Sequence, residues 1–217
     1  MKNILKSMAA IALLTASTAF AGPVVQIKGG LTTIILSEDI QAWLATCEVE
    51  RIKPAVQRPD GSRWRLWVTG GVLDLETYVG ELEHGGGMQI SCGDQPGETA
   101  SIQNLRAEYI NEVLVLTGVV VVGDEPLQRV PLFAPGGDAI ETSVSNGGTI
   151  RLAGIELRLT QAAADFLNAL LATDVFTAET VIGEAISRIK VLPSATGNRG
   201  KGKDKDDEEE PAESEDD

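Results

Sequence analysis

The sequence is poor in the side chains that hold metals or carry nucleophilic chemistry. It contains one histidine, His84, and two cysteines, Cys47 and Cys92. A single histidine excludes histidine-rich metal sites, and the cysteines lie too far apart to form a C-x-x-C redox or zinc motif. No G-x-S-x-G elbow is present, so the sequence offers no serine-hydrolase nucleophile. We therefore predict no metal site.

Positive charge and long apolar runs are also scarce. Lysine and arginine number 18 against 32 acidic residues, which gives a formal net charge of −14. Nucleic acids and anionic lipids repel such a chain, so we expect neither as a partner. The longest apolar run after the N-terminus, Val113 to Val122, is interrupted by Thr117 and Gly118. It is far shorter than the ~20 residues that span a bilayer and indicates a buried strand.

The N-terminus has the features of a secretory signal peptide. Lys2 and Lys6 precede an apolar run from Met8 to Phe20, and a small-x-small cleavage site ends at Ala21. Removing residues 1–21 with their two lysines takes the formal net charge from −14 to −16. The sequence thus predicts an exported protein, either periplasmic or extracellular, with no membrane span in the mature chain.

The mature chain divides into a domain and a tail. Residues 196–217 hold ten acidic and four basic residues with no large aliphatic side chain, which predicts a disordered acidic tail. Residues 22–195 are enough for one domain with a substantial core. Because an exported domain folds in an oxidising compartment, we expect Cys47 and Cys92 to form a disulfide bond.

Alternating and β-branched segments dominate residues 22–195. About ten short strands with regularly spaced turns indicate a mainly β fold, an antiparallel sandwich or partly open barrel. Two short helices interrupt the strands. Ser37 is the predicted N-cap of a helix over Glu38 to Thr46, and Thr160 is the predicted N-cap of a helix over Gln161 to Ala172.

The candidate ligand-binding residues are His84, Tyr78, Trp64 and Trp67. His84 stands beside a run of three glycines and is either a ligand contact or a partly exposed turn residue held by neighbouring carboxylates. Trp64 and Trp67 are three positions apart, so on a strand they face opposite sides of the sheet. One is expected in the core. The other is expected on the surface or in a pocket, where it could stack on a sugar or macrocycle.

The tyrosines have two possible roles. Tyr78 and Tyr109 could ligate haem iron as tyrosinate, or they could simply pack against the sheet.

Three segments resemble secreted bacterial β-rich domains. The first runs from Val68 to Met88 and contains Thr69-Gly70-Gly71, Asp74 and His84-Gly85-Gly86; the others are Val130 to Phe133 and Leu159 to Gly183. Among characterised proteins, the chain loosely resembles the haem-transport-associated domains of Gram-positive haem uptake systems. That resemblance implies a β-rich fold, with His84 on a strand similar to their histidine-glycine strand. Those domains carry a tyrosine haem ligand in an N-terminal Ser-x-x-Tyr-like stretch, whereas here no tyrosine precedes Tyr78.

These observations favour an exported, non-catalytic binding or structural module whose partner is an unidentified protein or a small hydrophobic ligand. The alternative is a binding protein for haem or another hydrophobic small ligand, and haem is the one cofactor that the sequence suggests. A carboxylate-based hydrolase is a further alternative. It would need carboxylates such as Asp74, Glu76 or Glu83 to be paired across a cleft.

Overall fold

The computed structural model describes residues 23–192, except for 59, 78, 93–98, 111–112, 124, 137–139, 146 and 172. The predicted signal peptide and acidic tail lie outside the described residues. The strands are β1 (Val24–Leu36), β2 (Cys47–Ile52), β3 (Val56–Gln57), β4 (Arg63–Asp74), β5 (Gly80–Gly85), β6 (Gly87–Cys92), β7 (Thr99–Ile110), β8 (Val113–Val122), β9 (Glu125–Gly136), β10 (Glu141–Val144), β11 (Thr149–Leu159) and β12 (Val181–Val191). The helices are α1 (Glu38–Leu44) and α2 (Gln161–Leu171).

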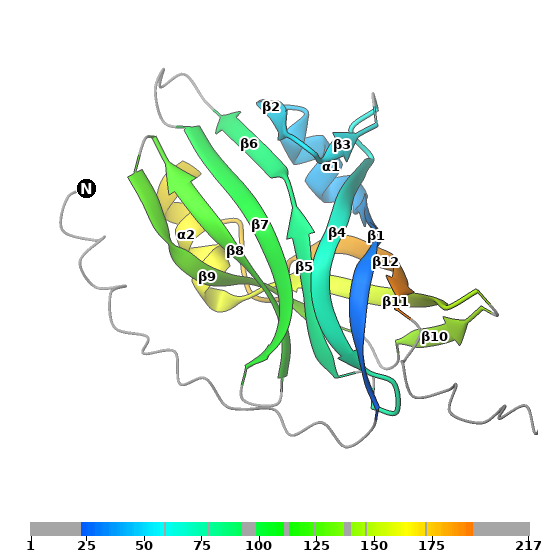
Figure 1. The fold of residues 1–217 in the computed structure, drawn as a ribbon. Coiled ribbons are helices and arrows are strands. Elements are labelled where there is room, and N and C mark those ends of the chain that lie inside the picture. Colours follow the sequence, from blue (N-terminus) through cyan, green and yellow to red (C-terminus); the bar gives the residue numbers. More distant parts are fainter. Residues whose placement is uncertain are drawn as a thin grey trace, which may run out of the picture.

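Eight of these strands form a closed antiparallel ring (Figure 1). Their order is β7, β5, β4, β1, β12, β11, β9 and β8, and the pairing of β8 with β7 closes the ring. β5 and β6 pair with successive parts of β7, so β6 and its neighbour β2 extend the sheet beyond the ring. The predicted mainly β fold with two helices is confirmed, and the ring is a barrel that closes.

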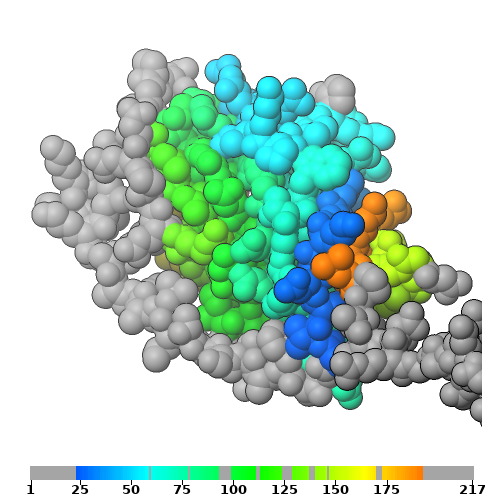
Figure 2. Space-filling view, viewed as in Figure 1, coloured from blue at the N-terminus to red at the C-terminus, as the bar shows by residue number. Residues whose placement is uncertain are grey.

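The first and last strands of the domain lie side by side. Thr32 of β1 stands opposite Ser187 of β12, and Leu36 stands opposite Gly183. In Figure 2 the blue N-terminal strand and the orange C-terminal strand form one continuous surface. Gly183 has a φ of +154°, and a Cβ there would collide with the backbone carbonyl oxygen of Ile35. This close approach of two backbones therefore requires a glycine.

Both helices begin at the predicted N-caps. The Ser37 hydroxyl accepts a hydrogen bond from the backbone N–H of Ile40 (3.4 Å), and the Thr160 hydroxyl accepts one from Ala163 (3.1 Å). Trp43 of α1 meets Phe176, after α2, in an edge-to-face contact with ring centroids 5.2 Å apart. The two helical segments thus contribute to one apolar cluster. Neither described helix has the length and hydropathy needed to cross a membrane.

The core consists of two apolar clusters. The larger one includes the buried faces of both helices together with Trp64 and Leu157. The smaller one contains strand residues alone: Val25, Ile27, Val68, Leu73, Leu82, Ile150 and Ile189. Both helices therefore pack into the larger cluster, whereas the smaller one is built by strands alone.

The predicted disulfide is present. Cys47 and Cys92 stand directly opposite each other in the β2–β6 pair, with their Cα atoms 4.4 Å apart. The bond fastens the strand at the sheet edge, β2, to its only paired neighbour among the described strands.

Candidate functional site

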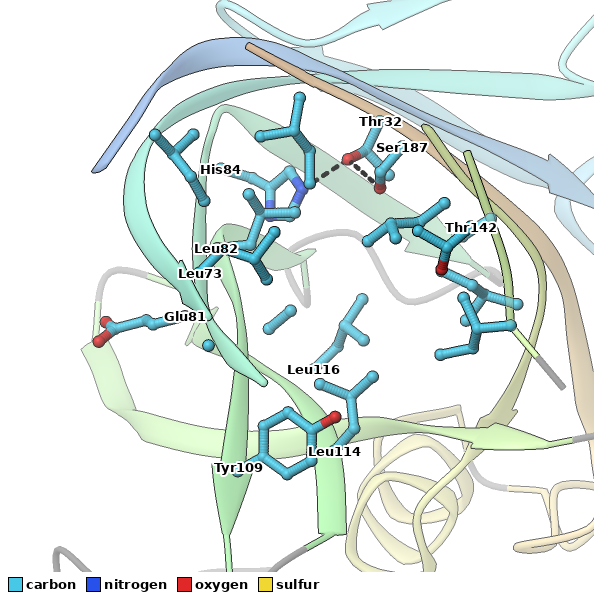
Figure 3. A pocket seen from close by; sticks show the side chains of 18 of the residues that line it. Thr32, Leu73, Glu81, Leu82, His84, Tyr109, Leu114, Leu116, Thr142 and Ser187 are labelled. Atoms are coloured by element: carbon cyan, nitrogen blue, oxygen red, sulfur yellow. Dashed lines mark hydrogen bonds between the residues drawn. The ribbon is translucent and has the colours of Figure 1, made fainter. Parts of the chain in front are cut away.

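A cavity of about 240 Å³ lies inside the ring of strands (Figure 3). No helix residue whose side chain the structure describes lines it. Its walls come from seven strands of the ring and are mostly aliphatic; the large aliphatic side chains of these strands are Ile27, Leu73, Leu82, Leu114, Leu116, Leu152, Ile155, Leu157 and Ile189. Such walls favour an apolar occupant, because apolar surface is stabilised when it leaves water.

Three buried polar side chains meet on one wall of this cavity. The Thr32 hydroxyl lies 2.7 Å from His84 Nε2 and 2.8 Å from the Ser187 hydroxyl (Figure 3). They project inward from β1, β5 and β12, and each is at most 4 % exposed. These three side chains form the polar end of the cavity.

His84 is neutral at physiological pH. Burial lowers the pKa of its imidazole to about 4, while a hydrogen bond from the ring to the Leu105 carbonyl raises the pKa and partly offsets that effect. Nδ1 lies 3.3 Å from the Leu105 carbonyl oxygen. Because a carbonyl oxygen can only accept, Nδ1 carries the proton and Nε2 has the free lone pair.

Other polar side chains lie farther from this group. Tyr109, on β7, and Thr142, on β10, contribute hydroxyls to the lining, and burial raises the pKa of the Tyr109 phenol. Glu81 also borders the cavity, but its carboxylate points away from it (Figure 3) and pairs with Arg106 at 2.8 Å. The described lining contains no lysine or arginine.

The fold has known counterparts, although no protein-family model and no curated protein matches the sequence. The C-terminal domain of HtaA from Corynebacterium glutamicum superposes with a TM-score of 0.60 at 11% identity, covering 77% of this chain and 99% of that domain. The N-terminal domain of HtaA superposes at 0.54 and 10% identity, covering 76% of this chain and 98% of that domain. The heme binding protein HtaB from the same organism superposes at 0.53 and 11% identity, covering 78% of this chain and 96% of HtaB. This chain has an HtaA-type fold. The resemblance to haem-transport domains is thus confirmed at the level of architecture.

The structure describes three of the four residues named from the sequence and places them in different surroundings. On the HtaA-type fold His84 lies in the cavity, on strand β5 and not in a turn, so its interpretation as a partly exposed turn residue is wrong. Tyr78 lies outside the described residues. Trp64 is fully buried beside a second apolar space of about 30 Å³, whereas Trp67 is 48 % exposed on the opposite face of β4. The opposite orientation of the two tryptophans is confirmed.

The place of Thr32 and Ser187 in this site was not predicted from the sequence. Each occupies an inward position of a strand whose neighbouring inward positions are apolar: Ile34 two residues after Thr32, and Ala185 and Ile189 on either side of Ser187. A polar residue that breaks such a period-two apolar pattern is the signal that could have found them. Only the order of the strands around the ring shows that Thr32 and Ser187 lie near His84.

Two of the three carboxylates considered for hydrolysis have structural contacts instead, and the third, Glu76, is exposed. Asp74 Oδ1 accepts hydrogen bonds from the backbone N–H groups of Glu76 (2.8 Å) and Thr77 (2.9 Å), which holds the turn after β4. Glu83 pairs with Arg106 at 2.9 Å. Neither Asp74 nor Glu83 lines the cavity.

Proposed function

We propose that this protein binds a hydrophobic small molecule in the cavity beside His84. The observation that carries the proposal is a largely aliphatic interior space of about 240 Å³ with three buried polar side chains clustered on one wall. A close-packed core normally leaves few voids larger than a water molecule. An apolar protein cavity of about 150 Å³ suffices to bind benzene, so this one has room for a ligand of naphthalene size.

The comparison with HtaB makes haem the first known ligand to test against this cavity. Part of the chemistry fits haem, because metal-binding histidines typically donate their second ring N–H to a carbonyl, as His84 does to Leu105. The remainder does not fit. His84 Nε2 is already engaged by Thr32, the described lining offers no cation for a propionate, and the cavity is smaller than the roughly 300–1,000 Å³ of sites for drug-sized ligands. The residues described therefore favour a smaller hydrophobic molecule than haem.

The proposal also places the protein outside the cytoplasm, with residues 1–21 as a signal peptide, residues 22–195 as the binding domain and residues 196–217 as a solvated tail. The Cys47–Cys92 bond supports this placement, because disulfides persist mainly in oxidising compartments. We further propose a non-catalytic role, supported by the structural contacts of Asp74 and Glu83 described above.

Calorimetric titration of the mature protein with naphthalene tests the proposal. We expect saturable binding at one site. Ala107→Phe and Ala185→Leu place extra side-chain volume into the cavity from β7 and β12, and each should abolish binding while the protein remains folded by circular dichroism. Trp67→Ala, a truncation on the outer surface, is the matched control and should bind like wild type.

Two results would contradict the proposal: an absence of saturable binding to wild type, or equal binding to wild type and to both folded cavity-filling variants. A parallel haemin titration followed by visible absorbance tests the size argument. A saturable Soret shift that is lost in His84→Ala would show that the cavity opens to take the macrocycle and that haem is the ligand.

A further inference from the structure

The polar end of the cavity has a fixed direction of hydrogen bonding. Because Nδ1 of His84 donates to the Leu105 carbonyl, Nε2 can only accept, and the Thr32 hydroxyl must donate to it. The opposite tautomer would set a nitrogen lone pair against a carbonyl oxygen. The structure therefore selects one arrangement of the protons on His84.

This direction continues from Thr32 to Ser187. A hydroxyl has a single proton and two acceptor lone pairs. Since Thr32 gives its proton to His84, it must accept the proton of Ser187 across the 2.8 Å contact between β1 and β12. Both hydroxyl protons are then used, and Ser187 Oγ retains lone pairs only. Towards an occupant of the cavity, this end presents acceptors and no free donor.

Charge sets a second restriction on the occupant. The described walls contain no lysine or arginine, and the imidazole of His84 is neutral. The carboxylate of Glu81 is turned away and paired with Arg106, so it offers no partner to a cation inside. A charged ligand group at the polar end would be desolvated without a counter-ion, which is strongly unfavourable.

We propose that the ligand is an uncharged, mainly apolar alcohol or phenol whose single hydroxyl donates a hydrogen bond to Ser187 Oγ. This inference rests on the proposed function, because it names the chemical class of ligand for the same cavity. Ser187 is thus the specificity-determining residue. The aliphatic walls supply most of the affinity, and the serine oxygen selects ligands that can donate a hydrogen bond.

A set of naphthalene derivatives tests this assignment by calorimetric titration at pH 7.5. The first compound, 2-naphthol, has a hydrogen-bond donor. Naphthalene and 2-methoxynaphthalene have no donor, and 2-naphthol is intermediate between them in size. The fourth compound, 2-naphthoate, is anionic. We expect 2-naphthol to bind about tenfold more tightly than either compound without a donor, since only it satisfies the buried acceptor. The anion should bind more weakly than all three.

Two serine variants test whether the preference for 2-naphthol depends on Ser187 Oγ. Ser187→Ala should weaken 2-naphthol alone and bring its affinity to within about threefold of that of naphthalene. Ser101→Ala removes another buried serine hydroxyl, one that does not line the cavity, and should leave the wild-type preference unchanged.

The wild-type comparison decides the inference even if a variant fails to fold. Equal affinity for 2-naphthol and 2-methoxynaphthalene, or tightest binding of the naphthoate, overturns the ligand class and leaves the proposed function standing. A preference for 2-naphthol that persists in folded Ser187→Ala overturns the assignment to Ser187. No binding of any of the four compounds overturns the proposed function itself.

Discussion

Acidification from pH 7 to pH 4.5 should destabilise the folded protein by about 2 kcal/mol through His84 alone. An unfolded chain binds a proton on this histidine near pH 6.5, whereas the folded protein binds it only near pH 4. Between these values the unfolded state holds more protons, so the free energy of unfolding falls as the pH falls and is insensitive to His84 above this window. The full separation of 2.5 pH units corresponds to roughly 3 kcal/mol. About 2 kcal/mol of that is lost by pH 4.5.

Urea unfolding of wild type and His84→Gln across this pH range isolates the effect. Carboxylates titrate in both proteins, so their contribution cancels when the two stability curves are subtracted. We expect His84→Gln to be less stable at pH 7 but to lose about 2 kcal/mol less on acidification. Parallel curves, or an imidazole pKa near 6.5 in an NMR titration of the folded protein, would refute the argument that this histidine is buried and neutral.

Three further changes test the fold by urea denaturation. Replacing Cys47 and Cys92 together by serine should lower the free energy of unfolding by about 4 kcal/mol in the chain-entropy model, given their sequence separation of 45. An unchanged midpoint of urea denaturation would show that the disulfide bond does not contribute to stability. Gly183→Ala should lower the free energy of unfolding by more than the roughly 1–2 kcal/mol of a positive φ, because the added Cβ meets a backbone carbonyl. Gly123→Ala, at φ +59° in open space, should lower it by no more than that amount. Equal losses in the two variants would contradict the close approach of the backbones at Gly183. Leu157→Ala, fully buried on the cavity wall, should cost about 2–5 kcal/mol, and a loss below 1 kcal/mol would mean that the wall is not packed as described.

Local features of this fold could be read from the sequence. Ser37 and Thr160 were identifiable as helix caps because each hydroxyl residue directly precedes an apolar periodic segment. The opposite orientations of Trp64 and Trp67 followed from the alternation of side chains along a strand. In both cases the physical cause lies within a few residues of the feature.

Features that depend on contacts between distant strands could not be predicted. The sequence contains nothing that tells β1 to pair with β12 and so close the ring, because register between separate strands is decided by the packing of the whole interior. The same limit applies to the polar end of the cavity. Thr32, His84 and Ser187 are separated by 52 and by 103 positions along the chain, and only the order of β1, β4, β5 and β12 around the ring brings them together.

The pairing of β1 with β12 also determines when this protein can finish folding. β1 is the first described strand to be synthesised, yet one of its two neighbours ends at Val191, almost at the last described residue. At roughly 5–20 residues per second, one edge of β1 waits on the order of ten seconds for its partner. During that time the edge exposes unpaired backbone N–H and C=O groups, which can pair with strands of other chains. The barrel therefore cannot close until β12 has been made.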